Sequence, residues 1–309
     1  MKRPNSFASF FGQEDAVGYL RVAVRSALAR NAVFGHTLML GPAGVGKTTL
    51  AASVLPAELG RQVQVINCAA ISKAEELTRK LVTVPEGSIL FLDEIHALIS
   101  EAREHLLTLM EDRTLTVVVP DQEPMTVIVP EFTIIGATTR VGNLDAPLRG
   151  RFKHSIRLST YTDVEMVQVL KWIAESYDNL QITDDAIAML VEPIHGVARM
   201  AVTMVEACID TLYGNSGQTG VVDGAIVTDT LSRLGYSFGL SSHEIRYLKA
   251  LGQVPSGKLG LATLAAMLDE TPTTVEEVYE PYLLRSGIIE KTGSGRKLGP
   301  QAVGKLFYV

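Results

Sequence analysis

The chain has 309 residues, 47% of them hydrophobic, with a formal net charge of −6 at neutral pH. This length and apolar content are enough for two or three domains, and the acidic balance excludes a uniformly basic nucleic-acid coat. The N-terminus lacks an apolar signal segment, no apolar run approaches about 18 residues, and two cysteines without metal-ligand spacing fit a reducing compartment. These features predict a cytoplasmic protein with no membrane span, in which any DNA contact is a local patch.

Residues 41–49, Gly-Pro-Ala-Gly-Val-Gly-Lys-Thr-Thr, fit the phosphate-binding loop pattern G-x-x-x-x-G-K-[ST]. Its four fixed positions are Gly41, Gly46, Lys47 and Thr48. A short apolar run at 36–40 predicts a buried strand before the loop, and 49–59 predicts a helix that Pro56 interrupts. Backbone N–H groups of such a loop surround phosphate, the lysine reaches the β- and γ-phosphates, and the threonine reaches Mg²⁺. The loop therefore predicts an ATP and magnesium site.

An unbroken apolar run at 88–92 ends in Asp93 and Glu94. A run without polar alternation is typical of a parallel strand buried on both faces, and ligands bind at the carboxyl ends of such strands. We expect Asp93 to hold magnesium and Glu94 to polarise the water that attacks the γ-phosphate. Two solvated acids at a strand end are the alternative. His96 is interpreted as a helix-start or core residue, because no second His or Cys lies at ligand spacing.

A third strand is predicted at 132–135, followed by two threonines. A hydroxyl here is placed to sense the γ-phosphate; Thr139 is the first choice and Thr138 the second, and simple loop capping is the alternative for either. The segment 147–152 then brings two arginines close together. One of them is a candidate arginine finger for a neighbouring subunit's site, against the plainer reading of two solvated surface arginines.

The chain divides into three predicted domains: an α/β parallel-sheet domain at 1–161, a helical domain at 162–235 and a third domain at 236–309. Helices are expected at 164–176, 184–192, 198–213, 242–251, 261–268 and 273–286. Thr183 is expected to cap the second of these, Thr274 and Glu277 to form a capping box, and 214–220 to be a loop. A terminal hairpin at 288–298 after three helices predicts a winged helix, a common duplex-binding module.

The segment 115–129 predicts a β-hairpin that protrudes from the sheet. Its two apolar runs flank the turn-like Pro-Asp-Gln-Glu-Pro at 120–124, and Met125 and Val127 keep apolar character at alternating positions. The alternative is a hairpin folded back onto its own domain.

Together these residues resemble the RuvB family, the AAA+ ATPases that drive branch migration of Holliday junctions. The resemblance covers nearly the whole chain. Its strings are Arg3-Pro4, Phe11-Gly-Gln13, the phosphate loop, Leu90–His96, Met110-Glu-Asp112, Phe132–Arg140, Pro147–Phe152, Tyr161, Val278–Leu284 and Gly295-Arg296. The Gly-Ala-Thr-Thr-Arg stretch and the Glu-Pro-Tyr-Leu segment are specific to the family and are not general AAA+ motifs.

The resemblance implies roles for further residues. Lys2 and Arg3 would flank the base and sugar, and Tyr161 would pack near the adenine. The phosphates and metal would be held by Gly44, Lys47, Thr48 and Thr49. The segment Glu111-Asp112-Arg113 would approach nucleotide from the adjoining subunit, and Arg151 would be the arginine finger. Arg199 would be the sensor arginine of the helical lid.

The resemblance also implies an ATP hydrolase that assembles as a homo-hexameric ring around duplex DNA at a four-way junction. A RuvA-like adaptor would dock on the 115–129 hairpin. Two other function classes stay open: an AAA+ loader or remodelling switch that acts on protein partners at DNA, and a nucleotide-dependent binding protein with little turnover. The family-specific strings and the winged helix disfavour the first, and the intact Asp93-Glu94 pair disfavours the second.

Departures from the family pattern concern DNA binding and the lid. The chain reads Gly-Val-Ala-Arg at 196–199, where relatives usually read Gly-Thr-Pro-Arg. Of three arginine positions in the wing, Lys291 keeps only the charge, Pro272 loses it and Arg296 is retained. Lys291 and Arg296 are the predicted DNA contacts, and we expect weaker DNA binding than is typical of the family.

Overall fold

The computed structural model describes residues 3–117, 123–216, 220–254 and 257–302. Contacts divide the chain into two compact units, one formed by Met1–Asp178 with Gly196–Val202 and the other by Asn179–His195 with Thr203–Val309. The domain boundaries expected from the sequence, at 161 and 235, remain a prediction. Within the described ranges, no helix combines the length and apolarity needed to cross a bilayer.

The first unit is built around five parallel strands in the order β2-β3-β6-β1-β7. Their bounds are β1 (Thr37–Leu40), β2 (Val63–Asn67), β3 (Ile89–Asp93), β6 (Thr133–Thr138) and β7 (His154–Arg157). The parallel α/β architecture predicted from the sequence is confirmed. Because β3, β6 and β1 are neighbours, the phosphate loop, the acidic pair and the threonines after β6 leave the sheet at the same edge.

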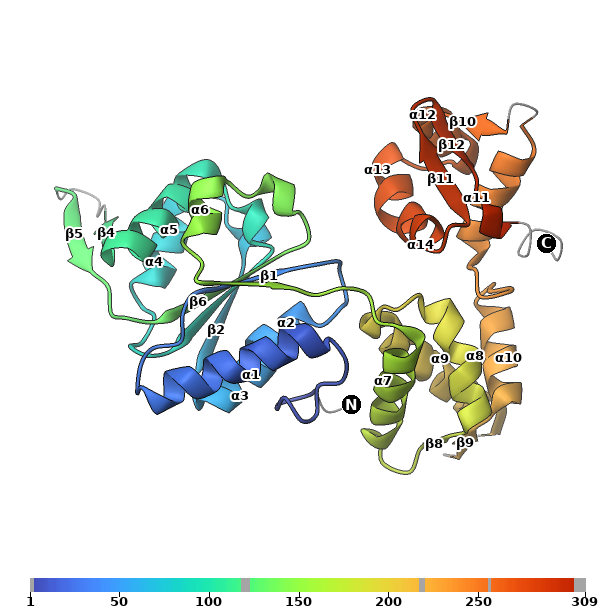
Figure 1. The fold of residues 1–309 in the computed structure, drawn as a ribbon, viewed down its shortest axis with the longest axis horizontal. Coiled ribbons are helices and arrows are strands. Elements are labelled where there is room, and N and C mark those ends of the chain that lie inside the picture. The colour runs from blue at the N-terminus through green and yellow to red at the C-terminus, as the bar shows by residue number, and fades with distance from the viewer. Residues whose placement is uncertain (1–2, 118–122, 217–219, 255–256, 303–309) are drawn as a thin grey trace. The chain divides into compact units, whose positions relative to one another are not determined.

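Helices cover both faces of this sheet (Figure 1). One face carries α1 (Glu14–Ala29) with α3 (Leu55–Leu59), and the other carries α4 (Ala74–Leu81), α5 (Ser100–Asp112) and α6 (Ala146–Gly150). Each helix of the second face is preceded by a short 3₁₀ turn that follows a strand. These turns are η2 (Cys68–Ala70), η3 (Ile95–Ala97) and η4 (Val141–Asn143). On the second face, leucines of α4 and α5 are buried against the apolar side chains of β3 and β6. Burial on both faces explains why these strands lack polar alternation.

The helix after the phosphate loop is not interrupted at Pro56, contrary to the prediction. It continues from α2 (Lys47–Thr49) through a π-helical turn, η1 (Leu50–Val54), into α3. The Leu55 N–H donates to the Leu50 carbonyl, five residues back. A proline ring clashes with the carbonyl four residues before it in a regular α-helix. The wider π turn accommodates Pro56 without ending the helix.

His36 bonds to two strands of the sheet, to β6 through its side chain and to β7 through its backbone carbonyl. Its Nδ1 accepts a hydrogen bond of 3.0 Å from the Ile134 N–H, while its own carbonyl accepts one from His154 N–H at 3.1 Å. Burial lowers the pKa of His36 from 6.5 to about 4. The neutral ring is therefore the form that the folded sheet requires.

We expect the His36 contribution to stability to be fully present above pH 6.5 and to be lost as pH falls toward about 4. The unfolded chain then binds a proton that the folded chain refuses, at a cost of up to about 3 kcal/mol. Urea unfolding at several values across this interval measures the effect. His36→Asn keeps an acceptor without titrating and should flatten the loss relative to the unmodified protein; equal pH dependence of the two proteins would contradict the assignment.

A two-stranded antiparallel hairpin, β4 (Thr114–Val117) and β5 (Met125–Ile128), extends beyond α4 and α5 (Figure 1). The predicted hairpin is confirmed for these strands. Residues 118–122, which include the end of the predicted first strand and the start of the predicted turn at 120–124, lie outside the described residues. Leu115 is buried, whereas the side chains of Met125 and Ile128 are 50% and 79% exposed. The hairpin thus presents apolar atoms to its surroundings.

The helical segment after Tyr161 contains α7 (Asp163–Glu175), α8 (Asp184–Ile194), α9 (Ala198–Ser216) and α10 (Gly224–Arg233), with a small parallel pair, β8 (Gln181–Ile182) and β9 (Val221–Val222). Thr183 caps α8 as predicted, accepting from the Ala186 N–H. The predicted loop at 214–220 is wrong at its start, because α9 continues to Ser216. There Asn215 donates to Asp229 of α10 at 3.1 Å, which offsets part of the cost of a helical glycine at 214.

The C-terminal part is a winged helix, as predicted. Its helices are α11 (Ser242–Gly252), α12 (Leu261–Leu268), α13 (Pro272–Thr274), the π turn η5 (Val275–Tyr279) and α14 (Glu280–Arg285), followed by the 3₁₀ turn η6 (Pro300–Ala302). The strands β10 (Lys258–Leu259), β12 (Gly295–Leu298) and β11 (Ile289–Thr292) pair antiparallel in that order. Gly295 has φ +141°, and a Cβ there would lie 2.3 Å from the Leu259 carbonyl oxygen. Only glycine allows this close approach of β12 to β10.

The capping box predicted at Thr274 and Glu277 is wrong. Thr271 is the N-cap, and its side chain accepts from the Thr274 N–H at 3.1 Å. Pro272 follows it at the first helical position, where a missing N–H costs nothing. The N-cap therefore lies three residues before Thr274, and the helix starts at Pro272.

Candidate nucleotide site and winged-helix surface

The phosphate loop lies between β1 and α2 and is closed by its own lysine. Lys47 is 5% exposed, and its Nζ donates to the carbonyls of Gly41 at 2.8 Å and Pro42 at 2.7 Å. Burial lowers the pKa of Lys47, against the opposing charges of Glu94 and Asp93. Gly46, at φ +108°, directs the chain into the helix that starts at Lys47. The N–H groups of that first turn are the donors that bind phosphate in such loops.

The acidic pair stands beside this loop. Asp93 ends β3, and its Oδ2 accepts from Thr48 Oγ1 at 3.3 Å. A hydroxyl and a carboxylate side by side are the oxygen ligands that Mg²⁺ prefers, so these two residues fit the predicted metal. Glu94 follows in the left-handed region, with φ 50°. This conformation is uncommon for a glutamate, and the Glu94 side chain contacts Thr139, the residue after β6.

Three groups surround the Glu94 carboxylate. Its Oε2 accepts from the N–H of Thr139 at 3.4 Å and from its Oγ1 at 3.3 Å, and it lies 3.1 Å from His96 Nδ1. Thr138 Oγ1 is 2.9 Å from the same His96 nitrogen. Both threonines considered from the sequence therefore belong to one network with Glu94. His96 is the second residue of the short turn η3, close to the helix start expected for it, but sequence reasoning missed its contact with Glu94.

The candidate residues for a neighbouring subunit gather elsewhere on the first unit. Arg151 forms an ion pair with Glu111 of its own chain. Both line a cavity of 340 Å³ together with Arg113 and Lys153. Asp112 ends α5 and is exposed. The predicted trans-acting residues Glu111, Arg113 and Arg151 are thus brought together, with Lys153 as a cation that the sequence did not single out.

The start of α9 is attached to the phosphate loop. The Arg199 N–H donates to the Gly44 carbonyl at 3.1 Å, and Gly44 has φ +76°. A Cβ on Gly44 would lie 2.7 Å from Val197 Cγ1 and 3.0 Å from Arg199 Cβ, so this contact requires glycine. Tyr161 is buried and donates to the Val45 carbonyl at 3.2 Å. Gly44, Tyr161 and Arg199, predicted separately, therefore meet at the loop.

The three other predicted nucleotide contacts are Thr49, Arg3 and Lys2. Thr49 is half-buried in α2, and Arg3 is exposed. Lys2 lies outside the described residues.

The two predicted DNA contacts of the wing are paired with glutamates. Lys291 Nζ lies 3.1 Å from Glu276 and 3.2 Å from Glu280. Arg296 donates to Glu280 through Nε at 2.7 Å and to Glu276 through Nη2 at 2.7 Å. The Arg296 side chain is only 11% exposed and that of Glu280 is fully buried. Sequence reasoning missed both carboxylates, although Glu280 stands in the family string Glu-Pro-Tyr-Leu.

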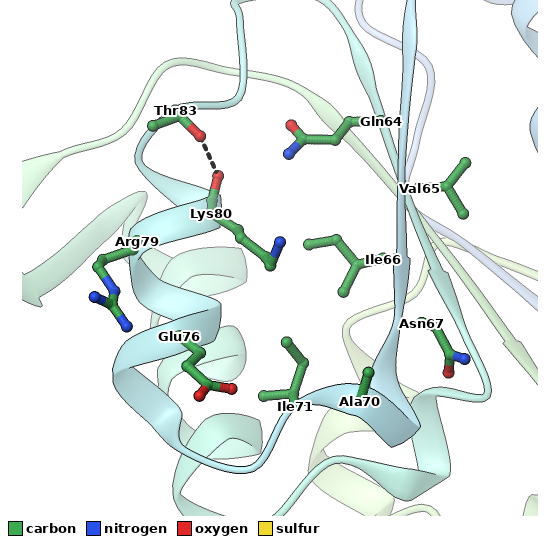
Figure 2. A pocket seen from close by; sticks show the side chains of 10 residues that line it. All are labelled: Gln64, Val65, Ile66, Asn67, Ala70, Ile71, Glu76, Arg79, Lys80 and Thr83. Atoms are coloured by element: carbon green, nitrogen blue, oxygen red, sulfur yellow. Dashed lines mark hydrogen bonds between the residues drawn. The ribbon is translucent and has the colours of Figure 1, made fainter.

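A larger hollow of 640 Å³ lies between the edge strand β2 and helix α4. Figure 2 shows Gln64 and Lys80 pointing into it from these two elements, and Arg79 pointing away. None of the predicted site residues lines it. Its lining contains neither the phosphate loop nor the acidic pair, so this hollow is separate from the candidate nucleotide site.

The phosphate loop follows β1, the acidic pair lies at the end of β3, and the polar end of β6 lies between them. This arrangement defines a P-loop nucleoside-triphosphatase domain. Residues 2–158 match the family model described as the Holliday junction DNA helicase RuvB P-loop domain. Residues 237–306 match the RuvB C-terminal winged helix domain. The chain belongs to the RuvB family.

Similar proteins cover the chain almost end to end. The Holliday junction branch migration complex subunit RuvB of Campylobacter concisus is 36% identical over 95% of this chain and 88% of its own length. The protein of the same name from Acholeplasma laidlawii is 35% identical over all of this chain and 93% of its own. The solved Thermotoga maritima RuvB Holliday junction branch migration motor has a TM-score of 0.85 at 33% identity, covering 99% of this chain and 98% of that one.

Proposed function

We propose that this chain is an ATP-driven motor that translocates duplex DNA and so drives branch migration of Holliday junctions in recombination and repair. One observation carries the proposal: a complete phosphate-loop site and a terminal winged helix occur in one chain that matches RuvB proteins over its whole length. A loader or protein-remodelling switch shares the nucleotide motifs but does not account for the chain-long match. The working form is a homo-hexameric ring in the cytoplasm.

ATP is the substrate and Mg²⁺ the metal in this proposal. Thr48 and Asp93 hold the ion, which when bound neutralises charge on the phosphates. Lys47 leaves the loop carbonyls for the β- and γ-phosphates, and Glu94 accepts the proton of the attacking water. Thr139 and His96, both in contact with the Glu94 carboxylate, orient it toward that water.

The remaining assignments concern neighbours. Arg151, beside Glu111 and Arg113, acts on the nucleotide of the adjoining subunit. Arg199, attached to the phosphate loop through its N–H, senses the γ-phosphate for the helical lid. The exposed side chains of Met125 and Ile128 support the hairpin as the docking site of a RuvA-like adaptor, because isolated exposed apolar strands are unfavourable in water.

The test is ATP hydrolysis by the full chain alone, with linear duplex, with a four-way junction, and with the junction plus a RuvA-like protein from the same source. We expect the junction with the adaptor to stimulate hydrolysis most, and labelled junction arms to be separated only when ATP is hydrolysed. Hydrolysis that a protein partner stimulates without any DNA, and no arm separation, would favour the remodelling switch instead.

A further inference from the structure

The inference concerns the wing and deepens the proposed function, on which it rests. All three cations of the β11–β12 hairpin, within its described residues, are bound to carboxylates of the winged helix. Lys291 and Arg296 share Glu276 and Glu280, and Lys297 lies 2.6 Å from Glu290. Two cations facing two carboxylates leave no net charge at the predicted DNA contacts.

The two shared carboxylates differ in their surroundings. Glu280 is fully buried and also accepts from the Tyr247 hydroxyl at 3.1 Å, so it anchors Arg296 within the core of the domain. Breaking such a buried pair leaves an uncompensated charge, which is strongly unfavourable. Glu276 is 42% exposed and lies on the π turn η5. Its pairs with Lys291 and Arg296 are screened by water and are individually weak.

Glu276, like a phosphate group, is an anion that accepts hydrogen bonds from these cations. A carboxylate that receives one bond from a lysine and one from an arginine occupies the position that a backbone phosphate takes at such a pair. Hydrogen bonds from Lys291 lower the pKa of Glu276, so it is ionised at neutral pH. A DNA phosphate that approaches these cations must therefore displace it.

We propose that Glu276 is an internal competitor of DNA at Lys291 and Arg296, and that it sets how tightly the wing holds a duplex backbone. Glu280 keeps Arg296 in place whether or not DNA is bound. Exchange of Glu276 for a phosphate releases a counterion from DNA but leaves an ionised glutamate that attracts one. The salt dependence of binding is then shallower than the number of contacts alone would give.

The test measures binding of the full chain to a short labelled duplex of random sequence by fluorescence anisotropy, with ADP present and salt varied. Glu276→Gln should bind about three- to tenfold more tightly at low salt, since two weak ion pairs no longer compete. The slope of log affinity against log salt should steepen by up to about one unit. Glu276→Asp, which keeps the charge, should stay close to the unmodified protein.

Glu290→Gln is the matched control, because Glu290 is 41% exposed, lies on the same hairpin and, among the described residues, forms its ion pair with Lys297. It should change affinity less than about twofold if the effect is specific to Glu276. Adding Lys291→Gln to Glu276→Gln should return most of the gained affinity. Equal gains in both glutamine variants, a gain that survives loss of Lys291, or no gain at all would overturn the proposal.

Failure of the motor function is distinguishable from these outcomes. Duplex binding is measured without hydrolysis and without a junction, so a Glu276→Gln gain with no branch migration would overturn only the function. If the chain separates junction arms but its Glu276→Gln variant gains no affinity for duplex, only the proposed competition by Glu276 is overturned.

Discussion

Replacing Glu94 by glutamine should lower the ATP turnover of the full chain by a factor of about 10²–10⁴, the usual contribution of a general base. The amide keeps the size of the side chain and can still meet Thr139, but it cannot accept a proton from water. Nucleotide binding should persist, because Lys47 and the loop amides do not depend on Glu94. The variant is expected to retain unhydrolysed ATP.

Phosphate release and binding of a fluorescent ATP analogue measure the two effects separately. Glu104→Gln is the control, since Glu104 is an exposed acid of α5 and its change should leave turnover unaltered. A Glu94→Gln enzyme with turnover within a few-fold of the unmodified chain would remove Glu94 from its assigned role. His96→Ala, which removes a contact of the same carboxylate, should show a smaller loss.

Mixing two inactive variants should restore hydrolysis if active sites are shared between subunits. Arg151→Ala is expected to lower turnover by about 10³–10⁵, the range for loss of an arginine finger, and Lys47→Ala should be similarly inactive. In a ring of equal parts, a productive site needs the Arg151 variant on one side and the Lys47 variant on the other. Random assortment gives ½ × ½, so roughly a quarter of the sites should recover when each site is shared in this way.

The control mixture combines Lys47→Ala with a chain that carries both changes, where no subunit offers Lys47 and no rescue can occur. Arg149→Ala tests whether position 151 is special, because Arg149 ends α6 two residues earlier and should tolerate the change. Absence of rescue in rings whose co-assembly is demonstrated would place Arg151 in its own chain's site. Its pairing with Glu111 would then be a structural contact only.

The parts of the site that follow a strand were predictable from the sequence. The phosphate loop and Asp93-Glu94 come directly after apolar runs, and a parallel sheet brings such strand ends to one edge without further information. The turn after Glu94 was not predictable, because its left-handed backbone decides that His96 faces the carboxylate. A sequence motif gives the residue types but not the backbone dihedral angles of Glu94.

The wing shows a second kind of limit. Lys291 and Arg296 were identified as cations suited to phosphate, but one of their two shared partners, Glu276, lies on a helical turn 15 and 20 residues earlier in the chain. Only packing of that turn against the hairpin reveals that the charges are already balanced. The start of the same helix was misplaced because two threonines suit a cap, and Pro272 decides between them.

The bond from the Arg199 amide to the Gly44 carbonyl is made entirely by main-chain atoms. Substitutions at Val197 and Ala198 leave both of its partners in place. Sequence changes at these two positions therefore do not remove the hydrogen bond, provided that residue 44 remains glycine. The side chains around this hydrogen bond can therefore differ while the phosphate loop and the start of α9 stay joined through the peptide backbone.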